Sequence, residues 1–127
     1  MTRKINLYYL YNSRKLILLK FTCLKGDTML IENVELLIKD FETLAGLVNR
    51  IAKSSEVSAE DVDLCNNLYK SIDSNETGNA MNEQILYTVS CIITMAAAKG
   101  DLDSLVGEAN SLIEEKLKRL HNLMSQY

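Results

Sequence analysis

The side chains that could support nucleophilic chemistry in this chain are three cysteines and one histidine. After residue 28, Cys65 or Cys91 with His121 are the only combinations of a thiol and an imidazole, which is the minimum for a cysteine nucleophile. Both cysteines fall among apolar residues at helical spacing, where a thiol usually behaves as a small core side chain. We therefore predict that the chain has no catalytic residue and is not an enzyme.

The cysteines also show no pattern of a metal or redox site. Cys23, Cys65 and Cys91 lie far apart, without the two-residue spacing of a metal-binding or redox pair, and they cannot all pair with one another. With His121 as the one histidine, a zinc site would need ligands from distant segments. We predict no metal and no cofactor, and a reducing, cytoplasmic location.

The other motifs of enzyme chemistry are missing from the sequence. Carboxylates cluster at 60 to 63, at 101 to 103 and at 114 to 115, but helix caps and solvated helix faces explain these positions. The Glu-x-x-His signature of two-iron bundles is absent, and the five glycines form no phosphate loop, nucleophile elbow or dinucleotide motif. A small-molecule substrate is therefore not indicated.

Charge divides the chain at Met29. Residues 1–28 carry a net charge of +5, and residues 29–127 carry eight basic and sixteen acidic side chains, a net charge of −8. Phosphate attraction needs clustered Lys and Arg, so nucleic-acid binding by the larger part is disfavoured. We divide the chain into a basic N-terminal segment, 1–28, and a domain, 29–127.

The N-terminal segment has several possible origins. The codons of residues 25–28 can spell a purine-rich run just before the codon of Met29, as at a bacterial ribosome-binding site, so the segment could be an untranslated-region artefact in a bacterial or phage gene. If it is translated, its strand-forming residues around Asn12 and Ser13 favour a hairpin, with an apolar helix-like or disordered arm as alternatives. Basic residues interrupt its apolar stretch, which argues against an export signal.

The domain shows helical periodicity from Leu30 onward. Apolar residues recur at spacings of three and four up to Ile51, which predicts a helix that ends near residues 53 to 55. Ser58, followed by acidic residues, predicts the start of a second helix, which should run to about Ser71 before a polar loop at 73–79.

The third predicted helix, about 80 to 99, carries no charge between Glu83 and Lys99. This uncharged run is shorter than the roughly 20 residues of a membrane span. Gly100 is placed to end this helix and Asp101 to cap a fourth, which should run from about Leu102 to Met124. Four helices joined by short connections predict an all-α antiparallel four-helix bundle.

Two interpretations of the apolar surfaces remain open. They could form the core of a monomer, or they could exceed what 99 residues can cover and so pair with a target helix or a second copy of the chain. On the second interpretation, the protein is a homodimeric adaptor, inhibitor or secretion-type chaperone without enzyme activity. Its predicted partner-binding residues are Val34, Leu37, Phe41, Leu44, Val48, Tyr69, Ile85, Tyr87, Ile92 and Ile93.

A different class of function is related to nucleic acid. The acidic domain could imitate the charge of DNA and block a DNA-binding protein, or the basic arm at 1–28 could contact nucleic acid directly. Direct binding through the arm would depend steeply on salt.

Overall fold

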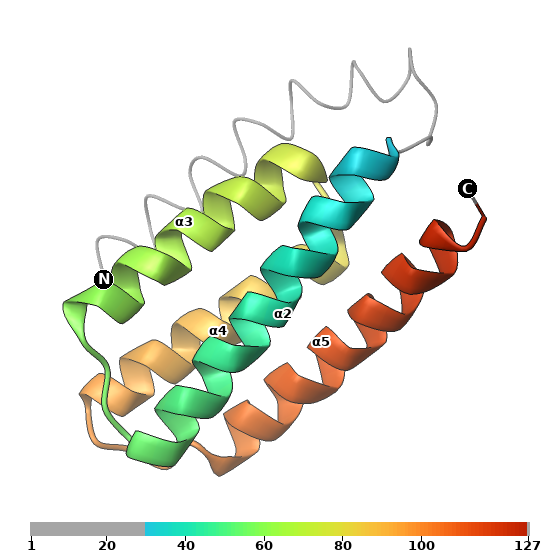
Figure 1. Ribbon diagram of the computed structural model, residues 1–127. Coiled ribbons are helices and arrows are strands. Elements are labelled where there is room, and N and C mark those ends of the chain that lie inside the picture. Colours follow the sequence, from blue (N-terminus) through green and yellow to red (C-terminus); the bar gives the residue numbers. More distant parts are fainter. Residues whose placement is uncertain (1–29, 127) are drawn as a thin grey trace.

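The computed structural model describes residues 30–126, and these residues form four helices (Figure 1). They are α2 (Ile31–Ser54), α3 (Ala59–Asn75), α4 (Ala80–Ala97) and α5 (Asp103–Met124). Consecutive helices run in opposite directions, which confirms the predicted all-α antiparallel bundle. The predicted hairpin, helix-like or disordered arm at 1–28 lies outside the described residues.

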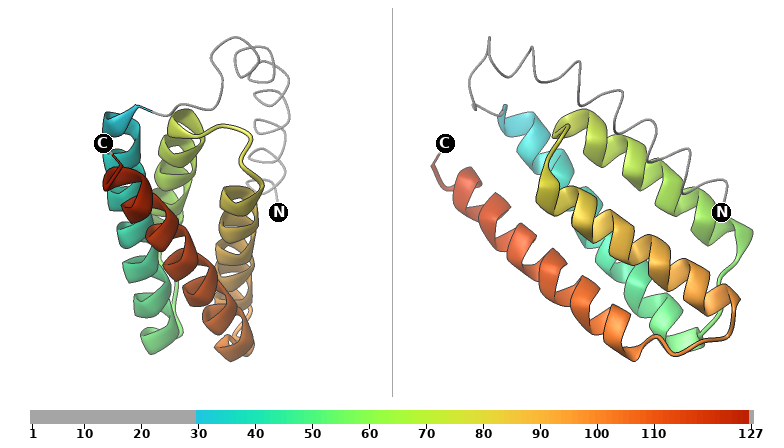
Figure 2. Two further views of the ribbon diagram at one scale, coloured as in Figure 1. Left: turned by 90° about the vertical axis from the view of Figure 1, so that its right-hand side faces the viewer. Right: turned by 180° about the vertical axis from the view of Figure 1, so that it is seen from behind.

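The helices do not contact one another equally. α2 packs mainly against α5 and α3, and α4 packs mainly against α5, whereas α3 and α4 touch little. Figure 2 shows α5 crossing obliquely from beside α2 toward α4, so that it closes the bundle between them. The core is built from the apolar seam of α2 and the inner sides of the other three helices.

The start of α3 follows from its cap. The Ser58 hydroxyl accepts a hydrogen bond from the Asp61 N–H (3.2 Å), and the Asp61 carboxylate accepts one from the Ser58 N–H (3.0 Å). This reciprocal pair satisfies two N–H groups that a helix start leaves without partners. The predicted start at Ser58 is confirmed.

The end of α3 differs from the prediction. The helix continues to Asn75, through residues whose polar character favours a loop. Asn75 donates a side-chain hydrogen bond to the Ser71 carbonyl (2.8 Å), and the Glu76 N–H extends the helical pattern to Ile72 (2.9 Å). Packing of buried Ile72 against the core thus carries the helix past its predicted end.

The turn between α4 and α5 also departs from expectation. Lys99, with φ at 60°, takes the left-handed position that glycine usually fills, and α4 ends at Ala97. The Gly100 N–H then bonds to the Met95 carbonyl (2.8 Å), and the Lys99 N–H bonds to the Ala96 carbonyl (3.1 Å). A side chain at Gly100 would collide with Met95, because an added Cβ would lie 2.2 Å from its Sδ. Gly100 therefore makes room for Met95 rather than supplying the left-handed residue.

Candidate protein interface

The structure separates the predicted partner-binding residues into two groups. Seven of them are fully buried in the core of the chain and do not contribute to its surface: Val34, Leu37, Phe41, Leu44, Val48, Ile85 and Ile92. Tyr69 and Ile93 are half-buried and pack against that core. Tyr87 alone among the ten is exposed, at 51%.

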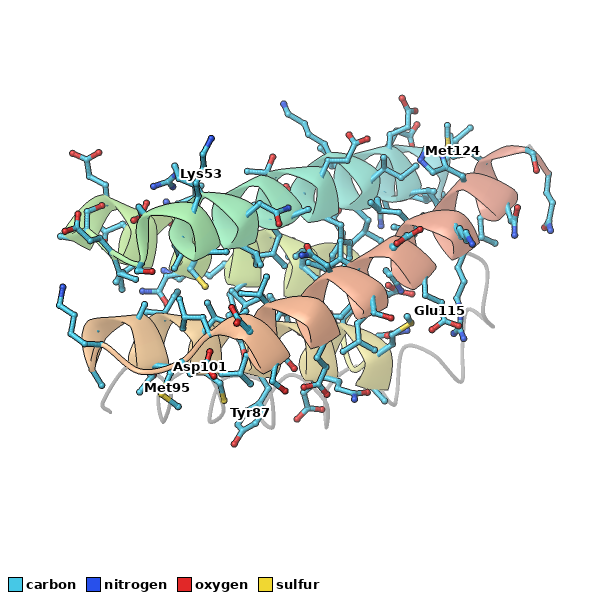
Figure 3. The ribbon with its side chains drawn as sticks, turned by 90° about the horizontal axis from the view of Figure 1, so that it is seen from below. Lys53, Tyr87, Met95, Asp101, Glu115 and Met124 are labelled. Atoms are coloured by element: carbon cyan, nitrogen blue, oxygen red, sulfur yellow. The ribbon has the colours of Figure 1, made fainter. Side chains whose placement is uncertain are left out.

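The open side of α4 surrounds Tyr87. Gln84, Tyr87, Cys91, Thr94 and Ala98 follow one another at spacings of three and four, which places them along one side of the helix. With Met95 beside them we call these six residues the α4 outer face. Figure 3 shows that Tyr87 and Met95 point to the same side, away from α2 and α5.

The α4 outer face is exposed and uncharged. Tyr87 is 51% exposed and Met95 is 39% exposed, and of the six residues only Cys91 is half-buried. The Thr94 hydroxyl donates to the Ser90 carbonyl within the same helix (2.9 Å). An exposed apolar surface on a small protein marks an interaction site more often than a surface of mixed charges does.

The opposite, inner side of α4 packs against the core of the bundle. Ile85, Val89, Ile92 and Ala96 are buried against the bundle, so α4 already contributes a complete inner side. The remaining uncharged residues therefore point outward. This arrangement is unlike that of a typical surface helix, whose outer side is polar and charged.

A polar cluster holds the N-terminal end of α4 in place. Glu76 Oε1 accepts hydrogen bonds from Lys116 Nζ (2.6 Å) and Asn82 Nδ2 (2.7 Å), and Glu76 Oε2 accepts one from Asn79 Nδ2 (3.2 Å). The side chain of Lys116 is only 5% exposed. The cluster joins α5 to the connection before α4, so it fixes the position of α4 against α5.

Sequence reasoning missed this cluster, although a signal was present. Lys116 follows buried Ile113 by three residues and precedes buried Leu120 by four, so it occupies the buried stripe of α5. The apolar pattern favours Leu117 for that position, and in the structure Leu117 is only half-buried. A lysine at this spacing predicts a buried partner carboxylate, because an unpaired buried charge is very costly.

A second ion pair ties α2 to the start of α3. An Arg50 guanidinium nitrogen lies 2.5 Å from the Asp61 carboxylate, which is almost fully buried. The hydrogen bond from Arg50 and those from Ser58 hold the pKa of Asp61 below its ordinary value. Asp61 is therefore a structural carboxylate that stays ionised at neutral pH.

The thiols and the imidazole considered for chemistry lie in different environments. Cys65 is buried in the core, and burial raises the pKa of its thiol to about 11. Cys91 is half-buried in the α4 outer face, and His121 is exposed in the last turn of α5. Burial also raises the pKa of Tyr69 to about 12. A thiol with such a raised pKa is a poor nucleophile at neutral pH.

Within 30–126, no group of three or more His, Cys, Asp or Glu side chains is arranged to hold a metal ion. None of the four described helices is long and apolar enough to cross a membrane.

No protein-family model, no curated protein and no solved structure matches the sequence or fold of this chain at a significant level.

Proposed function

We propose that this protein is a small non-enzymatic helical protein that binds another protein through the α4 outer face. The observation that carries the proposal is the exposure of Tyr87 and Met95 on a helix without a charge between Glu83 and Lys99. Charged residues are depleted at the centres of protein interfaces, whereas tyrosine and methionine are enriched there.

The two exposed side chains have complementary properties for such a role. Tyr87 offers a rigid ring with a polar end, a combination that often contributes most of the binding free energy at an interface. Met95 is flexible and polarizable, so it adapts to the shape of a partner surface. Both rise from a helix whose inner side is fully packed, so the surface is held in place by the core.

The surroundings of the face favour a partner with basic residues at the edge of its binding surface. Residues 29–127 carry a net charge of −8, and complementary charge at the rim of an interface speeds association and excludes like-charged competitors. We place this activity in the cytoplasm, where the free thiols of Cys65 and Cys91 would persist.

The test is affinity capture with three versions of the full 127-residue chain in a lysate of the organism that carries the gene. Tyr87→Glu puts a charge on the α4 outer face, and Leu36→Glu puts the same charge on α2 at a residue of similar exposure, 47%. We expect a stoichiometric partner to bind the unmodified chain and Leu36→Glu, and to be lost with Tyr87→Glu. Equal capture by all three versions, or no captured partner, would contradict the proposal.

A further inference from the structure

Asn82 is a buried amide in the first turn of α4, and its two ends have different surroundings. The residue is only 3% exposed, and its Nδ2 donates a hydrogen bond to Glu76 Oε1 (2.7 Å). Its Oδ1 is also buried, and among residues 30–126 it has no hydrogen-bond partner. A buried amide oxygen nearly always accepts a hydrogen bond, because an unpaired one costs free energy. Asn82 Oδ1 therefore requires a donor.

The opposite orientation of the Asn82 amide does not satisfy this requirement. Exchange of the two ends would place Oδ1 against Glu76 Oε1, and an ionised carboxylate only accepts hydrogen bonds. Two acceptors would then face each other, and Nδ2 would lose its own partner. The Glu76 carboxylate thus fixes the amide with Oδ1 on the unpaired side.

Lys116 brings unused donors to the same place. Its Nζ donates to Glu76 Oε1 (2.6 Å), the oxygen that also accepts from Asn82, so the two side chains lie beside each other. An ammonium group has three N–H donors, and the Lys116 side chain is only 5% exposed. No hydrogen bond joins Lys116 Nζ directly to Asn82 Oδ1. A buried acceptor and spare buried donors therefore meet around one carboxylate oxygen.

We infer that the cluster of Glu76, Asn82 and Lys116 binds one internal water molecule, which donates a hydrogen bond to Asn82 Oδ1 and accepts one from Lys116 Nζ. Water both donates and accepts, as these two groups require, and internal waters typically make about three hydrogen bonds to buried polar groups. The charges select a neutral ligand: Lys116 repels a cation, and Glu76 together with Asn82 Oδ1 repels an anion.

The bound water adds a link between α4 and α5. Asn82 belongs to the first turn of α4 and Lys116 to α5, and both are buried. The water can therefore exchange with solvent only when the N-terminal end of α4 moves away from α5. Its residence time measures that opening. This site is distinct from the α4 outer face, and the inference is independent of the proposed function.

The experiment is oxygen-17 relaxation dispersion of the solvent, which counts the water molecules that a protein holds for longer than its own tumbling time. We expect the full chain to hold one more such water than Asn82→Leu, because leucine has a similar size and no acceptor. The matched control is Asn49→Leu. Asn49 is an exposed asparagine that accepts a hydrogen bond from Asn110 (3.1 Å), so the count of long-lived waters should stay unchanged.

A second measurement uses the unmodified chain and does not depend on the folding of Asn82→Leu. Magnetisation transfer from water to the Asn82 side-chain amide protons should have the sign of a long-lived contact in NMR spectra. Transfer to the Asn49 side-chain amide should instead show the fast exchange of surface water. In a crystal structure, a water oxygen should lie within about 3.2 Å of Asn82 Oδ1.

Three results would overturn the inference. The first is the lack of long-lived transfer from water to the Asn82 amide in the unmodified chain. The second is a folded Asn82→Leu chain that holds as many long-lived waters as the unmodified chain. The third is a crystal structure with Lys116 Nζ itself within about 3.2 Å of Asn82 Oδ1, because a direct hydrogen bond would then satisfy the amide.

Discussion

The apolar seam of α2 and the α4 outer face both attract attention in the sequence, but they have opposite positions in the molecule. The seam residues Val34, Leu37, Phe41, Leu44 and Val48 are fully buried in the chain's own core. The α4 outer face instead presents Tyr87 and Met95 to the exterior. A strongly periodic stripe therefore marks the core of this bundle, and an absence of charge on the side opposite the core marks the candidate interface.

The physical reason for this difference lies in the number of apolar sides. The outer side of α2 carries charged residues such as Glu35, Lys39 and Glu42. Its single apolar stripe therefore packs into the core of the bundle, and no second apolar side remains. α4 buries Ile85, Val89 and Ile92 and still has no charge on its outer side. This second side presents the exposed side chains of Tyr87 and Met95.

Truncation of one large side chain in each region should give the largest difference in stability. Phe41→Ala removes a fully buried ring from the α2 seam and should lower the free energy of unfolding by about 3 to 5 kcal/mol. Tyr87→Ala removes an exposed ring and should change it by no more than about 0.5 kcal/mol. Urea unfolding at low protein concentration measures both. Similar losses of unfolding free energy for the two variants would contradict the assignment of Phe41 to the core and of Tyr87 to the surface.

The polar cluster at Glu76 tests how α4 is held in place. Glu76→Ala leaves the Lys116 ammonium buried without its carboxylate, and we expect a loss of about 3 kcal/mol in the free energy of unfolding. Replacing both residues, as Glu76→Gln/Lys116→Met, removes the charge and should recover more than half of that loss. Equal losses for the single and double variants would show that the pair does not act as a unit.

The buried thiol of Cys65 makes the stability of the core depend on pH. The folded-state pKa of Cys65 is raised to about 11 from an ordinary value of 9.0, so its contribution to stability is complete below pH 9 and is lost as pH rises through 11. Tyr69, raised to about 12, acts in the same direction at higher pH. We expect a loss of about 2 kcal/mol between pH 9 and 11, measured by urea unfolding.

The control for this prediction is Cys65→Ala. It is less stable at neutral pH, but its stability should fall less steeply above pH 9, because the buried thiol is gone. An unchanged slope in Cys65→Ala would contradict the assignment of the alkaline loss to the buried thiol.

The smallest expected effect on stability is at the turn after α4. Gly100→Ala places a Cβ where the Met95 side chain lies, and the flexible end of Met95 can move away. We expect a change of no more than about 0.5 kcal/mol in the free energy of unfolding, together with a shifted Met95 methyl signal in NMR spectra. A loss of unfolding free energy above about 1.5 kcal/mol with an unmoved methyl signal would contradict this explanation and would indicate strain in the backbone of the turn.

Much of the fold could be predicted because each helix has its own local signals. The periodicity of α2, the Ser58 cap and the charge distribution of α5 all indicated the same bundle. The extension of α3 to Asn75 and the left-handed Lys99 were not predictable, because packing outweighs the local preferences of Asn, Lys and Gly at those positions.

The candidate site was only partly predictable. Tyr87 was named as a possible anchor, but seven of the residues named with it are buried in the core. An apolar stripe has the same spacing whether it faces its own bundle or another protein, so periodicity cannot tell them apart. Only the arrangement of the neighbouring helices shows which side of α4 remains outside.

Hydroxyl-radical footprinting of the full chain, with and without the captured partner, tests the central claim most directly. Tyr87 and Met95 should be oxidised readily in the chain alone and become protected when the partner covers them. Half-buried Tyr69 and Met81 serve as internal references whose oxidation should not change. Oxidation of Tyr87 and Met95 that is the same with and without the partner would contradict the assignment of the α4 outer face as the binding surface.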